Sequence, residues 1–278
     1  MRCFVLGLRL APCPLTWWPF SPSLAASPTR ALPAGAKQAS TPGECVAACD
    51  ITFACLTTPE VCLEAVNGVG GVLSGIGAGK SYVDCSTVDE ETSQRIADAV
   101  TAAGGRFLEA PVSGSKKPAE DGQLIFLTAG DESLYHECKA ALEAMGKKHL
   151  FLGKTGAGAR MKLVVNMVMG SMMNAFAEGM ALSDAAGLKS EDLLDVLDNG
   201  AMSNPMFRMK GPNMAKGSFP TAFPLKHQQK DMRLALALGD KFSVGMPVAA
   251  AANETFKKAM DAGKSDDDFS AVLAVIKQ

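Results

Sequence analysis

The sequence is poor in the residues that build metal centres and disulfide scaffolds. It has three histidines among 278 residues. Its eight cysteines, at positions 3, 13, 45, 49, 55, 62, 85 and 138, form no C-x-x-C pair. Cys45 and Cys49 are spaced as neighbours on one helix face, which indicates packing rather than ligation. We therefore expect no metal site, and a reducing compartment rather than one in which disulfides form.

A strong charge of either sign is also missing. Lys and Arg number 27 and Asp and Glu 29, which gives a net charge of −2. This balance argues against nucleic acid or an anionic membrane as a partner. Outside the N-terminus, no apolar run approaches the roughly 18 residues that a membrane span needs. The chain is long enough for two domains with separate cores.

Residues 1–34 lack acidic side chains, and the first carboxylate of the chain is Glu44. The segment holds both tryptophans and six of the 15 prolines, which exclude a continuous helix or a central strand. One interpretation is a transit peptide for a plastid or mitochondrion, since such peptides are poor in acidic residues. The other, which we favour, is a segment that is not native to this fold. On that interpretation we expect a cytoplasmic protein.

From residue 36 onward, patterns typical of strands and helices alternate. The apolar run over 50–56 is typical of a buried strand, and Asp131 precedes a helical pattern as a cap. The expected strands are 50–56, 80–84, 106–109, 123–129 and 149–152, and the expected helices are 41–48, 59–66, 89–103 and 131–145. This alternation predicts an α/β domain over 35–156 with a mostly parallel sheet, and a loop over 110–118.

After Gly158 the pattern contains helices only. We expect a long helix over 159–186, a helix over 190–197 capped by Ser190, and helices over 224–238, 246–262 and 267–276. Asn204-Pro205 reads as part of a loop. The sequence therefore predicts an all-helical domain over 157–278.

The glycine-rich stretch Gly153–Asn166 (GKTGAGARMKLVVN) leads into that long helix. Its glycines let the backbone approach a ligand closely, and helix starts favour anionic ligands. Lys162 and Asn166 stand four residues apart, so both project from one face of a largely apolar helix. The ordinary interpretation is a surface lysine beside a satisfied asparagine. The functional hypothesis is a proton donor, Lys162, with a substrate clamp, Asn166.

Two further motifs have an ordinary and a functional interpretation. Ala110–Ser115 (APVSGS) offers the Ser113 hydroxyl and backbone N–H groups near Gly114 at the end of a predicted strand. It is either a ligand crevice or a plain Pro-Gly turn. Lys226–Asp231 (KHQQKD) opens a helix and places Lys226 and Lys230 on one face, where the ordinary expectation is a solvated surface.

Taken together, three separated motifs resemble those of the β-hydroxyacid dehydrogenase family. Members of this family are similar to 3-hydroxyisobutyrate dehydrogenase and to 6-phosphogluconate dehydrogenase. The motifs are Glu109–Leu124 (EAPVSGSKKPAEDGQL), Gly153–Asn166, and Lys226–Asp240 (KHQQKDMRLALALGD). Ser86–Asp89 (STVD) also matches. The sequence is most similar to the plant-type glyoxylate/succinic semialdehyde reductases of this family. The resemblance covers roughly residues 35–278 and implies a Rossmann-like parallel-sheet domain followed by a helical domain.

The resemblance implies a role for each motif residue. Lys162 would be the catalytic acid and Asn166 the substrate positioner. Ser113 and Gly114 would hold the substrate carboxylate. Thr87 and Lys230 would line the cofactor site. The residue chemistry agrees, because reducing an aldehyde by hydride leaves a developing alkoxide, which a lysine ammonium can protonate and stabilise.

The implied protein is an NADPH-dependent oxidoreductase that reduces glyoxylate, succinic semialdehyde or a related short aldehyde acid. The 35–156 domain would bind NADP, and the 157–278 domain would bind substrate and form a homodimer or homotetramer. A nuclear, chromatin-associated branch of the superfamily lacks the lysine, so Lys162 favours an enzyme.

The sequence departs from the family pattern at its start. The family begins with a strand, a glycine-rich turn, a helix and a second strand that together cradle the dinucleotide. Here only Phe4–Leu8 reads as a remnant of the first strand, and the remaining glycines are missing. Two alternatives follow from this departure. One is a cofactor-deficient, inactive homologue that acts only through self-association, and the other is an NAD-dependent 3-hydroxyacid dehydrogenase.

Overall fold

The computed structural model describes residues 4–8, 16–18 and 39–277. The chain divides into two compact units, Met1–Leu163 and Val164–Gln278, whose boundary falls inside the long helix α6 (Ala157–Ala185). Most of the predicted leader, residues 1–34, lies outside the described residues. Within the described ranges, no helix is both long and apolar enough to cross a membrane.

The first unit is built on an eight-stranded sheet in the order β2-β1-β3-β4-β5-β7-β6, with β8 paired to β7. The central strands β3, β4 and β5 pair in parallel, as the sequence predicts. Antiparallel pairs extend the sheet on both sides, a mixture that the strand–helix alternation did not predict. The strands are β1 (Phe4–Leu8), β2 (Thr16–Trp18), β3 (Ile51–Cys55), β4 (Ser81–Asp84), β5 (Arg106–Glu109), β6 (Val112–Ser113), β7 (Leu124–Gly130) and β8 (Gly146–Phe151).

The strand β1 corrects one expectation. As a remnant of the family's first strand it would run parallel to its neighbour in the sheet. Instead β1 pairs antiparallel with β3, with Leu6 opposite Phe53, and then antiparallel with β2. In a doubly wound sheet a helix follows the first strand, whereas here β1 is followed by a second short strand after only residues 9–15.

Side-chain caps explain where the helices of the first unit begin. Thr41 accepts a hydrogen bond from the Glu44 N–H, and Thr58, Asp89 and Asp131 cap α2, α3 and α5 in the same way. Prolines stand in the first turns of α1 and α2, where no N–H donor is needed. The helices are α1 (Pro42–Ala48), α2 (Pro59–Asn67), the 3₁₀ turn η3 (Val72–Ser74), α3 (Glu90–Ala102), α4 (Lys116–Glu120) and α5 (Glu132–Met145).

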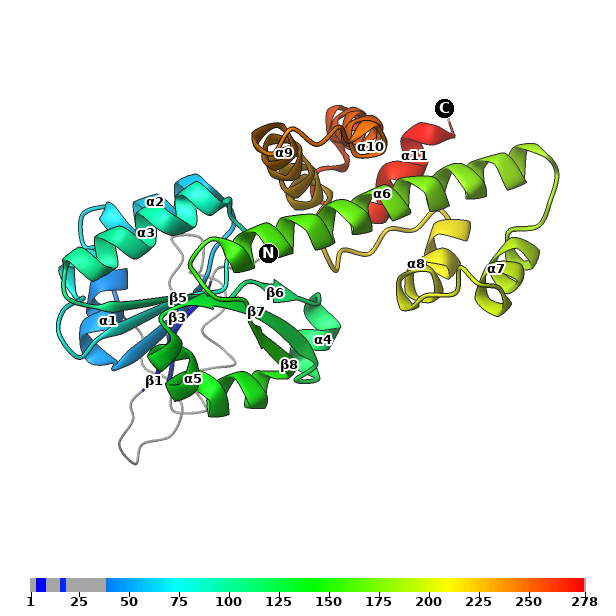
Figure 1. Cartoon of the computed structure of the whole chain (residues 1–278). Helices are drawn as coiled ribbons and strands as arrows, with labels where there is room; N and C mark the ends of the chain where they lie inside the picture. Colours follow the sequence, from blue (N-terminus) through cyan, green and yellow to red (C-terminus); the bar gives the residue numbers. More distant parts are fainter. Residues whose placement is uncertain (1–3, 9–15, 19–38, 278) are drawn as a thin grey trace. The chain divides into compact units, whose positions relative to one another are not determined.

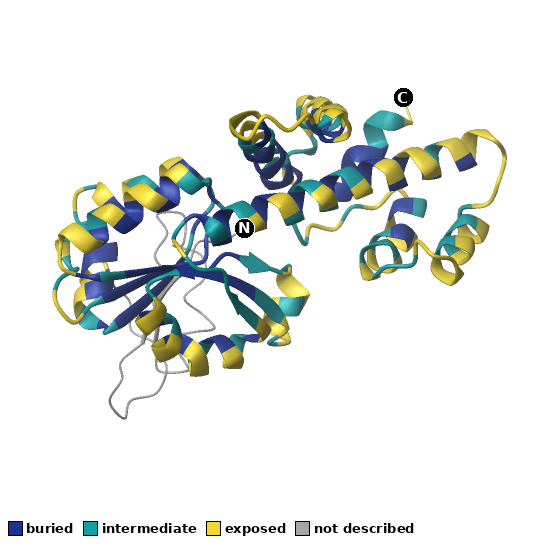
Figure 2. Cartoon of the chain, in the orientation of Figure 1, coloured by how far each residue is buried: buried dark blue, intermediate teal, exposed yellow. Residues whose placement is uncertain are grey.

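Alternation of side chains along the strands gives the sheet two apolar faces. Ala54, Tyr82 and Phe107 pack on one face with buried residues of α1, α2 and α3. Ile51 and Phe53 pack on the other face with the apolar side of α5. Figure 1 shows α2 and α3 on one side of the sheet and α5 on the other, and Figure 2 shows the buried central strands.

The second unit is helical, which confirms the predicted class. Its core is rich in methionine, including Met173, Met180 and Met232, packed around Phe256. Its elements are the main part of α6, then α7 (Ser190–Asn199), α8 (Pro205–Ala215), α9 (Leu225–Lys241), α10 (Pro247–Ala259), the π-helical turn η4 (Met260–Lys264), the 3₁₀ turn η5 (Phe269–Val272) and α11 (Leu273–Ile276).

Three local expectations are wrong. The segment read as a loop at Asn204-Pro205 opens α8, where the Asn204 side chain accepts from the Phe207 N–H and Pro205 occupies the first turn. Ser190 is the first residue of α7 rather than its cap. The loop expected over 110–118 contains the short strand β6 and the start of α4.

Candidate active site

The start of α6 depends on glycine. Gly153 and Gly156 have φ of 94° and 95°, a left-handed backbone conformation that side chains rarely adopt. At Gly158 an added Cβ would lie 2.3 Å from the carbonyl oxygen of Leu127. The helix can therefore begin against strand β7 only if this residue has no side chain.

Lys162 and Asn166 lie one turn apart on α6, and both are buried. Lys162 is 7% exposed and Asn166 is 2% exposed. An ammonium group is seldom buried without a partner or a function, because desolvation disfavours its charge. The ordinary interpretation of a solvated surface lysine is therefore wrong for Lys162.

Asn166 is held by helix α9. Its side-chain Nδ2 donates to Asp231 Oδ2 at 2.6 Å, and its backbone oxygen accepts from Gln228 Nε2 at 2.9 Å. The Lys230 ammonium lies 3.0 Å from Asp231 Oδ1, so one carboxylate joins Lys230 to Asn166. Lys230 is 8% exposed, which overturns the expected solvated face at this position. Lys226 fits that expectation, since its side chain is half-exposed and pairs with Asp266.

Ser113 and Gly114 form the end of β6 and the bend after it. β6 pairs antiparallel with β7, with Ser113 opposite Ile125. Gly114 has φ of 134°, and a Cβ there would lie 2.8 Å from Leu124 Cδ2. The Ser113 side chain is half-buried. The bend therefore favours glycine at position 114.

Thr87 follows β4 at the carboxyl edge of the parallel strands. The turn before it is fixed, because the buried Asp84 carboxylate accepts from the Ser86 N–H at 2.9 Å. Ser86 Oγ in turn accepts from the Leu56 N–H, after β3, at 2.8 Å. Ligands bind outside the carboxyl ends of the strands in doubly wound sheets. Thr87 stands half-buried at that edge.

The described residues fit one part of a dinucleotide site and not another. The short turns after β3 and β4 lead to the capped starts of α2 and α3, as they do in a nucleotide-binding crevice. The position next to β3, where the glycine-rich turn belongs, is taken by the antiparallel β1. The turns after β3 and β4 therefore suit a dinucleotide, whereas the described residues next to β3 provide no glycine-rich cradle for its pyrophosphate.

The structure directly joins two of the predicted residues, Asn166 and Lys230, through Asp231. The other predicted residues belong to the first unit, at three places in the chain: Thr87 after β4, Ser113 and Gly114 at the end of β6, and Lys162 on α6. Sequence reasoning missed three buried polar residues, namely Glu109, Gln228 and Asp231. Each lies within one of the motifs named above. It could have been recognised in the sequence as a polar residue at a position where the helix or strand pattern predicts burial.

A Rossmann-like unit that continues through one long helix into a helical unit, with a buried lysine on that helix, defines a class of nicotinamide-dependent dehydrogenases. Residues 16–153 match the NAD binding domain of 6-phosphogluconate dehydrogenase. Residues 156–276 match the NAD-binding domain of NADP-dependent 3-hydroxyisobutyrate dehydrogenase. The chain belongs to the 3-hydroxyisobutyrate dehydrogenase family of oxidoreductases, as its motifs predict. Its cofactor class is a nicotinamide dinucleotide.

The chain is 60% identical over 243 residues to glyoxylate/succinic semialdehyde reductase 1 of Arabidopsis thaliana, covering 87% of this chain and 84% of that protein. The chloroplastic reductase 2 of the same plant is 56% identical over 243 residues, covering 87% and 68%. The crystal structure of a 3-hydroxyisobutyrate dehydrogenase from Salmonella typhimurium gives a TM-score of 0.85 at 25% identity, over 94% of this chain and 91% of that chain.

Proposed function

We propose that this chain is an NADPH-dependent reductase of short aldehyde acids such as glyoxylate and succinic semialdehyde. The observation that carries the proposal is the buried Lys162, one turn from an Asn166 that Asp231 holds in place. The Arabidopsis relatives at 60% and 56% identity, named for these two substrates, support the substrate class.

Each residue has a defined task in this proposal. When bound, NADPH would supply the hydride that reduces the aldehyde carbon. Lys162 donates a proton to the developing alkoxide and stabilises its charge. Asn166 orients the reacting group, because Asp231 fixes its amide. Ser113 and the N–H groups around Gly114 bind the substrate carboxylate. Thr87 contacts the nicotinamide side of the cofactor, and Lys230 lines the cofactor site.

The first experiment is a titration of the purified chain with NADPH, followed by protein fluorescence, with glyoxylate then added. Saturable micromolar binding followed by NADPH consumption supports the reductase. If a parallel titration shows binding of NADH but not of NADPH, and the chain reduces NAD⁺ to NADH while it oxidises a hydroxyacid, an NAD-dependent 3-hydroxyacid dehydrogenase is favoured. A folded chain that binds neither dinucleotide is an inactive homologue.

Replacement of Lys162 tests the catalytic role. Lys162→Ala should lower kcat by about 10²–10⁴-fold, the usual worth of a positioned proton donor. The matched control is Lys154→Ala, which removes an exposed lysine of the preceding loop and should leave kcat unchanged. A Lys162→Ala protein that keeps more than about a tenth of the wild-type kcat would contradict the proton-donor role.

We also propose that the chain forms a homodimer through α6, with a tetramer requiring a second surface. Six exposed, uncharged residues form a row along the part of α6 in the second unit, here called the α6 stripe: Val164, Val168, Met172, Ala175, Gly179 and Leu182. Their spacing of three and four residues keeps them on one face. A second copy presents the same apolar face, which suits a two-fold interface.

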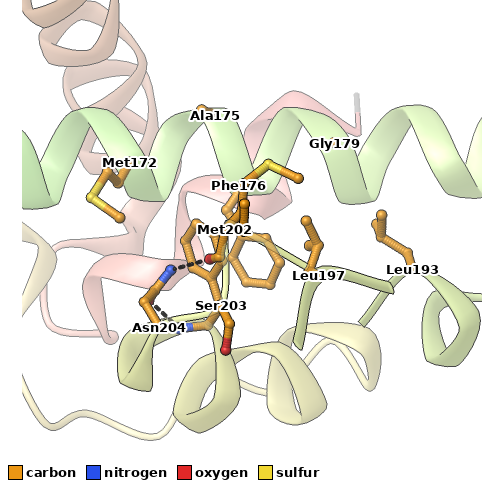
Figure 3. A pocket seen from close by; sticks show the side chains of 11 residues that line it. Met172, Ala175, Phe176, Gly179, Leu193, Leu197, Met202, Ser203 and Asn204 are labelled. Atoms are coloured by element: carbon orange, nitrogen blue, oxygen red, sulfur yellow. Dashed lines mark hydrogen bonds between the residues drawn. The ribbon is translucent and has the colours of Figure 1, made fainter. Parts of the chain in front are cut away.

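The α6 stripe borders an apolar groove of about 460 Å³ within the second unit. Figure 3 shows Met172 and Phe176 of α6 on one side of the groove and Leu193 and Leu197 of α7 on the other. Apolar side chains of a second copy could fill such a groove, which supports the helical unit as the site of self-association.

We further propose the cytoplasm as the compartment, and residues 35–156 as the NADPH-binding domain. The alternative is a plastid or a mitochondrion, and the plastid has the support of one Arabidopsis relative that is described as chloroplastic. A fluorescent fusion at the C-terminus of the whole chain distinguishes them, since a plastid signal would show that residues 1–34 act as a transit peptide.

A further inference from the structure

Glu109 is a buried carboxylate with no task in the proposed reaction. It is the last residue of β5 and is 2% exposed. Its Oε1 accepts from the Gly158 N–H at 2.7 Å and from the Ala159 N–H at 3.4 Å. Its Oε2 accepts from the Ser93 hydroxyl of α3. The carboxylate thus joins a strand and a helix to the first turn of α6.

Ionisation of the Glu109 carboxyl costs stability, because burial disfavours its charged form. Burial raises the pKa of Glu109 above its usual 4.5, and the hydrogen bonds from Ser93, Gly158 and Ala159 oppose this only in part. Because the folded pKa is raised, the folded chain binds more protons than the unfolded chain above pH 4.5. The stability contribution of Glu109 therefore falls as pH rises through this range. Neutral isosteres of buried charges are often as stable or more stable.

The Glu109 carboxylate lies at the N-terminus of α6, where a negative charge can hold the first turn of the helix. The first N–H groups of a helix lack intrahelical partners and carry partial positive charge. Gly158 lies one turn before Lys162, so the carboxylate fixes the turn that carries the lysine. An ion pair between Arg160 and Glu90, with the two charged groups 2.5 Å apart, also holds this turn. It is half-exposed, and ion pairs at such sites contribute little stability.

We propose that Glu109 is a positioning residue that holds the first turn of α6 and thereby sets the placement of the Lys162 ammonium. This inference rests on the proposed role of Lys162 as proton donor. It also explains why a destabilising buried charge stands at this position, since functional sites commonly lower stability.

The test is Glu109→Gln, which keeps the shape of the side chain and removes its charge. Misplacement of a catalytic group lowers the reaction rate, so kcat should fall about tenfold. The KM for glyoxylate should stay within about twofold of the wild-type value. Tm should be unchanged or higher. In a Lys162→Ala background the same substitution should cause no further loss, because it acts through the lysine. The control is Glu90→Gln, which removes the weaker ion pair with Arg160. Its kcat should stay within about twofold of the wild-type value.

A wild-type kcat in Glu109→Gln would overturn the proposal. So would a joint fall of kcat and Tm that is repeated in full in the Lys162→Ala background, because that pattern marks a purely structural role. If Glu109→Gln does not fold, Ser93→Ala replaces it, and an unchanged kcat there counts against the proposal. Failure of the proposed function is separately visible, as a Lys162→Ala protein that stays active.

Discussion

His227 is a histidine that the fold keeps neutral. It is 8% exposed and lies beside Phe223, with the ring centres 6.4 Å apart and the ring planes inclined by 32°. Burial, followed by the positive charges of Lys230 and Lys226, lowers its pKa from 6.5 to about 4, and Asp231 opposes this shift. His227 adjoins the Asn166–Asp231–Lys230 network, so its protonation would add a third positive charge to that part of α9.

The lowered pKa predicts acid sensitivity. Between pH 6.5 and about 4 the unfolded chain binds a proton that the folded chain does not, so stability falls as pH falls through this window. In His227→Gln this contribution is absent, and Tm should fall less between pH 7 and 5 than in the wild type. Above pH 7.5 the difference in Tm between the two proteins should be constant. If the plots of Tm against pH for the two proteins stay parallel down to pH 5, His227 does not titrate in this way.

The sequence pointed to polar residues that stand in a recognisable motif, and it missed buried polar residues whose partners lie on other elements. Lys162 and Asn166 follow from helical spacing and a glycine-rich loop. The contact of Asp231 with Asn166 is visible only in the structure, because the Asp231 oxygen lies 2.6 Å from an amide that is 65 positions earlier in the chain. Glu109 is similar, since its partners Gly158 and Ala159 belong to another element. Local patterns contain no information about such pairings.

The contact between α6 and β7 is set by the absence of one side chain. Gly158→Ala would place a Cβ 2.3 Å from a backbone oxygen, where no flexible side chain can move away. We expect a loss of about 1–3 kcal/mol in the free energy of unfolding, as for overpacking, together with a lower kcat because the turn before Lys162 shifts. Gly77→Ala is the control, since its Cβ would meet nothing closer than 4.0 Å, and it should be neutral or slightly stabilising. Urea unfolding and kcat measurements check both.

Element boundaries were predictable where a cap fixes them. Thr41, Thr58, Asp89 and Asp131 each cap a helix start within the first unit, so short-range chemistry was sufficient. The helix α8 carries the same kind of signal in Asn204-Pro205, but its first turns lack a clear apolar period. The antiparallel direction of β1 was not predictable, because strand direction is set by a partner some 45 positions away.

At the scale of the whole molecule, a single copy of the chain does not explain why the α6 stripe is both exposed and apolar. Val168 is 46% exposed and Leu182 is 71% exposed, and no stripe position is charged. Exposed apolar rows of this length mark interaction sites in soluble proteins. The net charge of −2 gives little repulsion between two copies of the chain. The small residues Ala175 and Gly179 near one end of the stripe allow two helices to approach closely.

The dimer is tested by placing charge on the stripe. Val168→Glu and Leu182→Glu should each weaken association by more than tenfold, because an isologous interface brings the two copies of a new carboxylate into the same apolar contact. Sedimentation velocity at micromolar concentration should then find monomers, with the helical content unchanged. Val69→Glu makes the same substitution at an exposed position of the first unit and should leave the wild-type dimer intact. A wild-type chain that sediments as a monomer, or stripe variants that stay dimeric, would contradict association through α6.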